Sequence, residues 1–194
     1  MYLPSLPLEA LRPRWCEPGQ YVLVEDQRVV ACSPEAAAAG VSIGMRQGGA
    51  STVAPGATIL DRAVARERMA LDAIALALLQ FTPELAQIGD TTMILDVTAS
   101  LRLFDGHAAL CRRVRAVVHA LGFSINLGTG PTAMGAWMLS VARIPARRSR
   151  RRRAIKPSTL NALLDPLDCR LLPSAARFSS SMSVDLGHPR FGIS

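Results

Sequence analysis

Aromatic residues, lysines and closely spaced cysteines are scarce in this sequence. Phe, Trp and Tyr together make up 5% of its 194 residues, although 49% of the residues are hydrophobic. The core must therefore be built from aliphatic side chains and alanine, a composition that favours closely packed helices. A chain of this length can bury a real core, and it accommodates one full domain with a small appendage.

The cysteine usage argues against both a zinc site and a disulfide framework. Cys16, Cys32, Cys111 and Cys169 are widely scattered, with no Cys-x-x-Cys pair and no histidine at ligand spacing. The N-terminus also lacks a basic region and a continuous apolar run, so the sequence predicts neither a signal peptide nor a membrane span. A reducing, cytoplasmic location is the default expectation.

The positive charge is concentrated in one segment. The net charge is +7, and only +1 remains without six arginines: Arg147, Arg148, Arg150, Arg151, Arg152 and Arg153. This cluster is either a linker that contacts DNA phosphates or a solvated run between domains. No aromatic residue is interleaved to stack on a base, so nothing indicates base reading.

Apolar periodicity and capping residues predict alternating strands and helices. Strands are expected as a hairpin over residues 20–33, at 92–97 and at 123–130. Helices are expected at 34–39, 61–80, 110–121 and 131–141, with mostly loop and one more short helix over 41–60. Helices that recur against one sheet indicate an α+β or α/β sandwich.

Acidic residues and histidines are the first candidates for chemistry. Asp90, Asp96 and Asp105 border the strand at 92–97 and are either metal ligands or turn and cap residues; we favour the second interpretation. The three histidines have no partner at catalytic spacing and are expected to be structural or solvated: His107, His119 and His188.

Four motifs follow one another along the chain: VVACSPEAAAAGVSIGM, FTPELAQI, LDVTASLRLFDG and GTGPTAMGAWMLSVA. Their order and spacing resemble those of the palm and fingers of Y-family, UmuC-like translesion DNA polymerases, and the opening YLPSLPLEAL resembles the catalytically inactive ImuB branch. The resemblance implies an α+β fold, with a ferredoxin-like palm sheet, packed helices and a small helical fingers insert. The expected divisions are a palm and fingers domain at 1–143, with the insert at about 20–80, a basic linker and partial thumb at 144–178, and a disordered tail at 179–194.

In active relatives, carboxylates hold two divalent cations, and basic and hydroxyl groups grip the triphosphate. Alignment through the motifs places Tyr2, Pro4, Thr91 and Thr92 at the carboxylate positions. Residues at the triphosphate positions are equally unsuited: Pro34, Ala37, Ala133 and Trp137. The resemblance therefore implies a palm without nucleotidyl transfer, metal or cofactor.

The ImuB resemblance implies a noncatalytic adaptor in bacterial SOS damage tolerance, which contacts DNA through the arginine cluster. It also implies a sliding clamp, an error-prone polymerase subunit and a RecA-like protein as partners, although the regions that usually bind them are missing. Residues 100–104, SLRLF, resemble a clamp-binding peptide but are expected to pack in the core. Two alternatives stay open: residual polymerase activity with Asp90 and Asp96 as ligands, or a nonfunctional DNA-binding fragment from a truncated or frameshifted gene.

Overall fold

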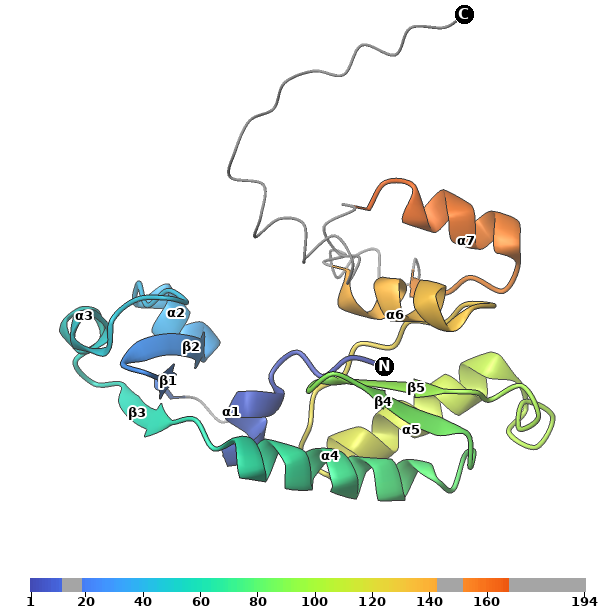
Figure 1. Cartoon of the computed structure of the whole chain (residues 1–194), viewed down its shortest axis with the longest axis horizontal. Coiled ribbons are helices and arrows are strands. Elements are labelled where there is room, and N and C mark those ends of the chain that lie inside the picture. Colours follow the sequence, from blue (N-terminus) through green and yellow to red (C-terminus); the bar gives the residue numbers. More distant parts are fainter. Residues whose placement is uncertain (12–18, 143–151, 168–194) are drawn as a thin grey trace, which may run out of the picture. The chain divides into compact units, whose positions relative to one another are not determined.

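The computed structural model describes residues 1–11, 19–142 and 152–167 (Figure 1). Its helices are α1 (Leu6–Leu11), α2 (Pro34–Ala38), α3 (Gln47–Val53), α4 (Val64–Leu78), α5 (His107–Ala120), α6 (Ala133–Val141) and α7 (Pro157–Leu164). Its strands are β1 (Tyr21–Glu25), β2 (Arg28–Cys32), β3 (Thr58–Asp61), β4 (Leu85–Ile88) and β5 (Thr92–Leu95). The expected α+β class is confirmed.

Residues 19–61 form a small sheet with two short helices, which we name the fingers module. The predicted hairpin is present: β1 pairs antiparallel with β2, and Asp26 and Gln27 make the turn with positive φ angles of 48° and 61°. The predicted helix α2 starts after Ser33, whose hydroxyl accepts the N–H of Ala36. Strand β3 lies in a stretch expected to be mostly loop and pairs parallel with β1. A strand of four residues that pairs with a strand far away in the sequence has no turn or hairpin pattern beside it, so the local sequence does not predict it.

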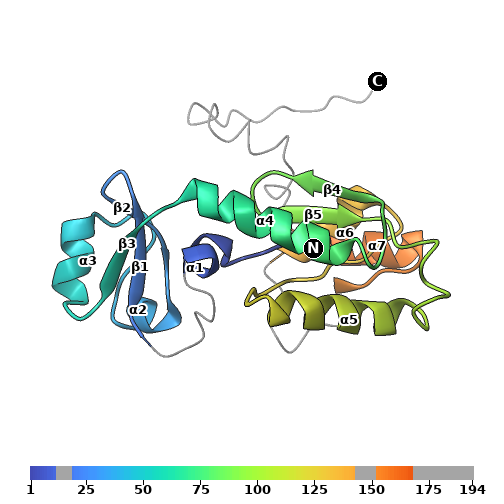
Figure 2. The same ribbon diagram turned by 90° about the horizontal axis from the view of Figure 1, so that it is seen from below.

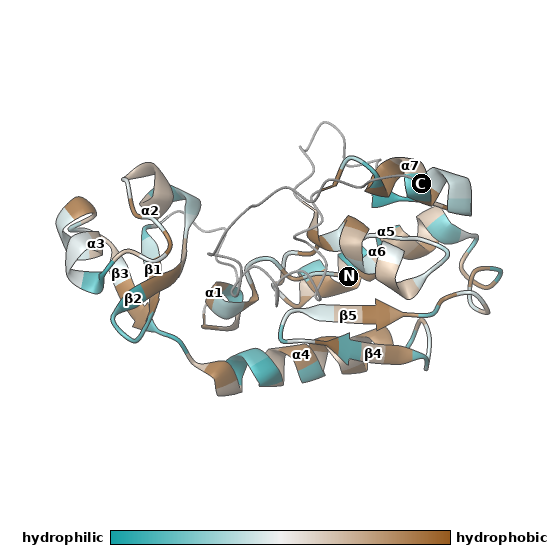
Figure 3. Ribbon diagram, turned by 45° about the horizontal axis from the view of Figure 1, so that its top comes forward, coloured by the Kyte–Doolittle hydropathy of each residue, from teal (hydrophilic) through white to brown (hydrophobic). Residues whose placement is uncertain are grey.

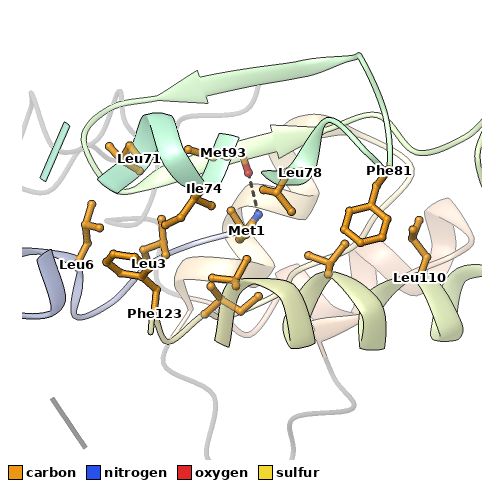
Figure 4. Packing of buried hydrophobic residues seen from close by; sticks show 13 residues of the cluster. Met1, Leu3, Leu6, Leu71, Ile74, Leu78, Phe81, Met93, Leu110 and Phe123 are labelled. Atoms are coloured by element: carbon orange, nitrogen blue, oxygen red, sulfur yellow. Dashed lines mark hydrogen bonds between the residues drawn. The ribbon is translucent and has the colours of Figure 1, made fainter. Parts of the chain in front are cut away.

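The main hydrophobic core unites the N-terminus with α4, β5 and α5. Leu71, Ile74 and Leu78 form the buried face of α4 and pack with Met93 of β5 and with Leu110, in the first turn of α5 (Figure 4). Helices α4 and α5 lie side by side, and β4 pairs antiparallel with β5 (Figure 2). We name residues 1–11 and 62–127 the palm module.

Arg62 links the fingers module to the palm module. Its guanidinium donates two hydrogen bonds to Glu67 of α4, at 2.7 and 2.9 Å, and one to Glu25 of β1, at 3.0 Å. These hydrogen bonds raise the pKa of Arg62 above its ordinary value. The buried carboxylate of Glu67 is thereby compensated by a bidentate partner.

The last part of the chain packs around α6. Leu139 of α6 forms a small core with Ala154 and with Leu160 of α7. Gly128 precedes α6 and must be glycine, since a Cβ atom there would lie 2.3 Å from the Ala136 carbonyl oxygen and 2.3 Å from the Ser140 nitrogen.

The chain divides into two compact units, Met1–Leu127 and Gly128–Ser194. The domain boundary expected after residue 143 and the fingers insert expected at about 20–80 stay predictions. Helix α4 packs in the main hydrophobic core. The expected tail at 179–194 lies outside the described residues. None of the described helices has the length and apolarity needed to cross a membrane.

Candidate functional site

Tyr2 and Thr92 lie directly opposite each other in an antiparallel bridge of the palm module. The Leu3 N–H donates to the Thr91 carbonyl at 2.9 Å, and the Met93 N–H donates to the Met1 carbonyl at 3.0 Å. On its other side Tyr2 exchanges two backbone hydrogen bonds with Asn126, at 2.9 and 2.8 Å. Tyr2 and Thr92, two of the four residues that align with carboxylates of active polymerases, are therefore neighbours across this bridge.

The other two positions lie at the edges of this arrangement. Thr91 is half-buried in the turn that leads into β5, next to the buried Thr92. Pro4 is exposed in the turn before α1. The four side chains supply two hydroxyls, one phenol and no anionic oxygen.

The nearby aspartates are turn residues in the structure. Asp96 is exposed after β5, and its Oδ1 accepts the Thr98 N–H at 2.9 Å. Hydrogen bonds from Thr98 hold the pKa of Asp96 below its ordinary value. Asp90 is exposed in the β4–β5 turn, while Asp105 has a φ of 57° and lies 3.6 Å from the guanidinium of Arg113. These positions agree with the turn interpretation.

The palm positions do not fit the divalent cations of an active polymerase. Hard cations need several oxygen ligands that include carboxylates, and Tyr2, Pro4, Thr91 and Thr92 bring none. Across the residues that the structure describes, no group of three or more His, Cys, Asp or Glu side chains could hold a metal ion. We therefore derive no step that involves a metal.

The four triphosphate positions are on two helices. Pro34 and Ala37 are exposed on α2, with Pro34 at its first position. Ala133 begins α6 and is exposed, and Trp137 follows one turn later, half-buried. None of these side chains carries a charge that could bind phosphate.

The arginine cluster is described only at its end, since Arg147, Arg148, Arg150 and Arg151 lie outside the described residues. Arg152 is partly buried and donates from Nη1 to the carbonyls of Leu139 and Ser140, at 3.1 and 2.6 Å, near the end of α6. Burial lowers its pKa. Arg153 is exposed. Arg152 thus stabilises a helix end, and Arg153 is available to solvent.

Residues 100–104 form helical turns rather than an extended peptide. The Phe104 N–H donates to the Ser100 carbonyl at 3.2 Å. Leu101 and Phe104 pack against the main core, and the ring of Phe104 meets that of Phe81 edge-on at 5.3 Å. Leu103 was expected to pack but is 77% exposed.

Of the candidate histidines, His107 begins α5, and its Nδ1 lies 3.7 Å from the sulfur of Cys111. His119 is exposed in the last turn of the same helix, and His188 lies outside the described residues.

Two arginines of the fingers module that the sequence did not single out lie at a recess. Arg28 and Arg46 line an open recess of about 560 Å³, formed by residues 26–28 and 46–49, which we name the fingers recess. The sequence holds one signal for it: these are the only basic residues between Gly19 and Asp61.

Solved structures with the same architecture are Y-family DNA polymerases. The insertion ternary complex of Dbh DNA polymerase matches with a TM-score of 0.69 at 18% identity, over 94% of this chain and 56% of that protein. DinB from Sulfolobus solfataricus matches with a TM-score of 0.66 at 18% identity, over 93% of this chain and 55% of that protein. The fold is that of a Y-family palm with fingers, and the chain spans just over half the length of these polymerases.

A family model places the chain more narrowly. Residues 12–141 match the model of the impB/mucB/samB family, so the chain belongs to that family. A search of curated proteins found no match. The Y-family resemblance and the palm fold are confirmed, whereas the assignment to the ImuB branch stays a prediction.

Proposed function

We propose that this chain is a noncatalytic Y-family polymerase-like protein that acts as an adaptor in DNA damage tolerance. The observation that supports the proposal is the bridge between Tyr2 and Thr92, because it joins two positions that the resemblance assigns to carboxylates and neither residue is acidic. Without anionic oxygens on both strands, two cations cannot be held to activate a 3′-hydroxyl and neutralise the developing charge.

Membership of the impB/mucB/samB family and the polymerase fold support a role at DNA. Two of the structural matches are ternary complexes of a DNA polymerase. We propose nonspecific phosphate contacts through the exposed part of the arginine cluster, in the bacterial cytoplasm. The ImuB resemblance adds a sliding clamp, an error-prone polymerase subunit and a RecA-like protein as proposed partners.

Residual polymerase activity is the competing function, and it would require Asp90 and Asp96 as ligands. The structure gives the Asp96 carboxylate a backbone partner in its own turn and leaves Asp90 exposed in the β4–β5 turn. Both observations favour the adaptor.

Metal binding and DNA binding can be measured on the same sample. We expect the full chain to bind a primer–template in a fluorescence anisotropy titration, with affinity that falls steeply as salt increases. We also expect that Mn²⁺ with a nucleoside triphosphate will not broaden the amide NMR signals of Thr91 and Thr92 selectively. Selective broadening would reveal a bound metal and contradict the proposal, and absence of DNA binding would remove the adaptor role at DNA.

A further inference from the structure

The fingers recess brings together two arginines that are distant in sequence. Arg28 and Arg46 form an isolated antiparallel bridge between the start of β2 and the residue that precedes α3. The flanking hydrogen bonds run from the Val29 N–H to the Met45 carbonyl at 2.8 Å and from the Gln47 N–H to the Gln27 carbonyl at 2.9 Å. This pattern defines a non-hydrogen-bonded pair, the arrangement in which opposing side chains are closest.

Two like charges at directly opposite positions destabilise a strand pair unless a counter-charge lies between them. Both arginines are exposed, and within the described part of the chain neither forms an ion pair. The Arg28 Nη1 donates to the Gly44 carbonyl at 3.0 Å, which fixes one edge of its guanidinium. Asp26 also lines the recess, so the three charged side chains leave a net positive charge. The single carboxylate of Asp26 therefore balances only part of the positive charge of Arg28 and Arg46.

Two glycines of α3 also line the fingers recess. Gly48 and Gly49 lie in the first turn of α3 and line the recess. A Cβ atom at Gly48 would meet nothing within 4 Å, so packing does not require glycine there. Because glycine is less favourable than alanine in a helix, Gly48 is a locally unfavourable residue that leaves the recess open. The recess adjoins the hydrophilic turn between β1 and β2, and the strands themselves are hydrophobic (Figure 3).

We propose that the fingers recess binds a phosphate group, with Arg28 and Arg46 as the two cationic ligands. Guanidinium groups match phosphate oxygens in geometry and charge, and one anion between them removes the repulsion of the pair. The phosphate belongs either to the backbone of single-stranded nucleic acid or to a free anion. The nucleic-acid form rests on the proposed role at DNA, whereas binding of a free phosphate does not.

The test combines NMR with a matched pair of variants. Inorganic phosphate and an oligothymidylate are titrated separately into the full chain at constant ionic strength, and the amide signals of Gly48 and Gly49 are followed. The recess variant is Arg28→Gln with Arg46→Gln. The control, Arg112→Gln with Arg115→Gln, removes the same charge from two exposed positions of α5. Thermal unfolding verifies that each variant is folded.

We expect both titrants to shift the Gly48 and Gly49 signals in the wild type and in the control, but not in the recess variant. We also expect the recess variant to bind the oligonucleotide at least threefold more weakly, with a salt slope lower by about 0.7, as the loss of one neutralised single-strand phosphate predicts. Asp26→Asn should strengthen binding, because it removes the acidic group from the lining. Shifts with inorganic phosphate alone would support the site and assign it to a free anion.

The proposal is overturned if neither titrant shifts these signals, or if the recess and control variants lose the same affinity. Oligonucleotide binding without recess shifts would leave the role at DNA in place and reject the recess. Recess shifts with phosphate, combined with no oligonucleotide binding, would reject the role at DNA and keep the recess.

Discussion

Asp96 carries a carboxylate directly after β5, but its Oδ1 accepts a backbone N–H of its own turn. Thr92, three residues before Leu95-Asp96, is buried opposite Tyr2 and carries no charge. Asp90 precedes these residues in an exposed turn. The two aspartates are therefore turn residues, whereas the uncharged Thr92 lies buried beside Tyr2.

The Asp96 carboxyl should titrate below its ordinary pKa, because the hydrogen bonds from Thr98 stabilise its charged form. The folded pKa is lowered, so this group stabilises the fold above its unfolded pKa, and the contribution is lost as the pH falls through the folded pKa. An NMR pH titration should show the Thr98 amide signal following the same midpoint. Mg²⁺ should leave that signal unchanged at neutral pH, and a saturable shift would identify Asp96 as a metal ligand.

Helix α3 and the turn before α5 each contain a glycine with open space around it, but for different reasons. Gly48 lies inside α3, where any residue fits the backbone, whereas Gly106 precedes α5 with a φ of 86°. A Cβ atom would meet nothing within 4 Å at either position. Backbone conformation alone therefore distinguishes the two.

Gly48→Ala should raise the free energy of unfolding by about 0.5–1 kcal/mol, since alanine favours the helix. Gly106→Ala should lower it by about 1–3 kcal/mol, because a φ of 86° with a ψ of 179° is a backbone conformation essentially restricted to glycine. Urea unfolding in phosphate-free buffer measures both. A destabilised Gly48→Ala protein would mean that glycine is required there by the fold, and it would weaken the case for the fingers recess.

Near the end of α6, adjacent arginines have separate roles. Arg152→Ala should lower the free energy of unfolding by about 1.5 kcal/mol, because two carbonyl acceptors lose a charged donor. Arg153→Ala should change it by less than about 0.5 kcal/mol, yet lower the salt slope of DNA binding by about 0.7–0.9. Unfolding curves and anisotropy titrations of both variants test this division, and equal effects of the two would contradict it.

Across the whole molecule, the sequence predicted the elements that have strong local signals. The amphipathic pattern of α5 and the capping residues of α2 are local, and both helices were found. Strand β3 and the bridges of Tyr2 to Thr92 and Asn126 depend on partners far along the chain, so no local pattern reveals them. The resemblance supplied the palm fold and the degenerate positions. It could not supply the fingers recess, because the Arg28–Arg46 bridge joins residues from a hairpin and a loop.

Nucleotide incorporation shows whether this palm catalyses nucleotidyl transfer, which we propose it does not. Purified full chain in excess over a labelled primer–template is incubated with all four nucleoside triphosphates and Mg²⁺ or Mn²⁺, with an active Y-family polymerase as positive control. We expect no primer extension above background with either metal. Extension by the wild type that Asp96→Asn abolishes would contradict it and show that the palm catalyses nucleotidyl transfer with other ligands.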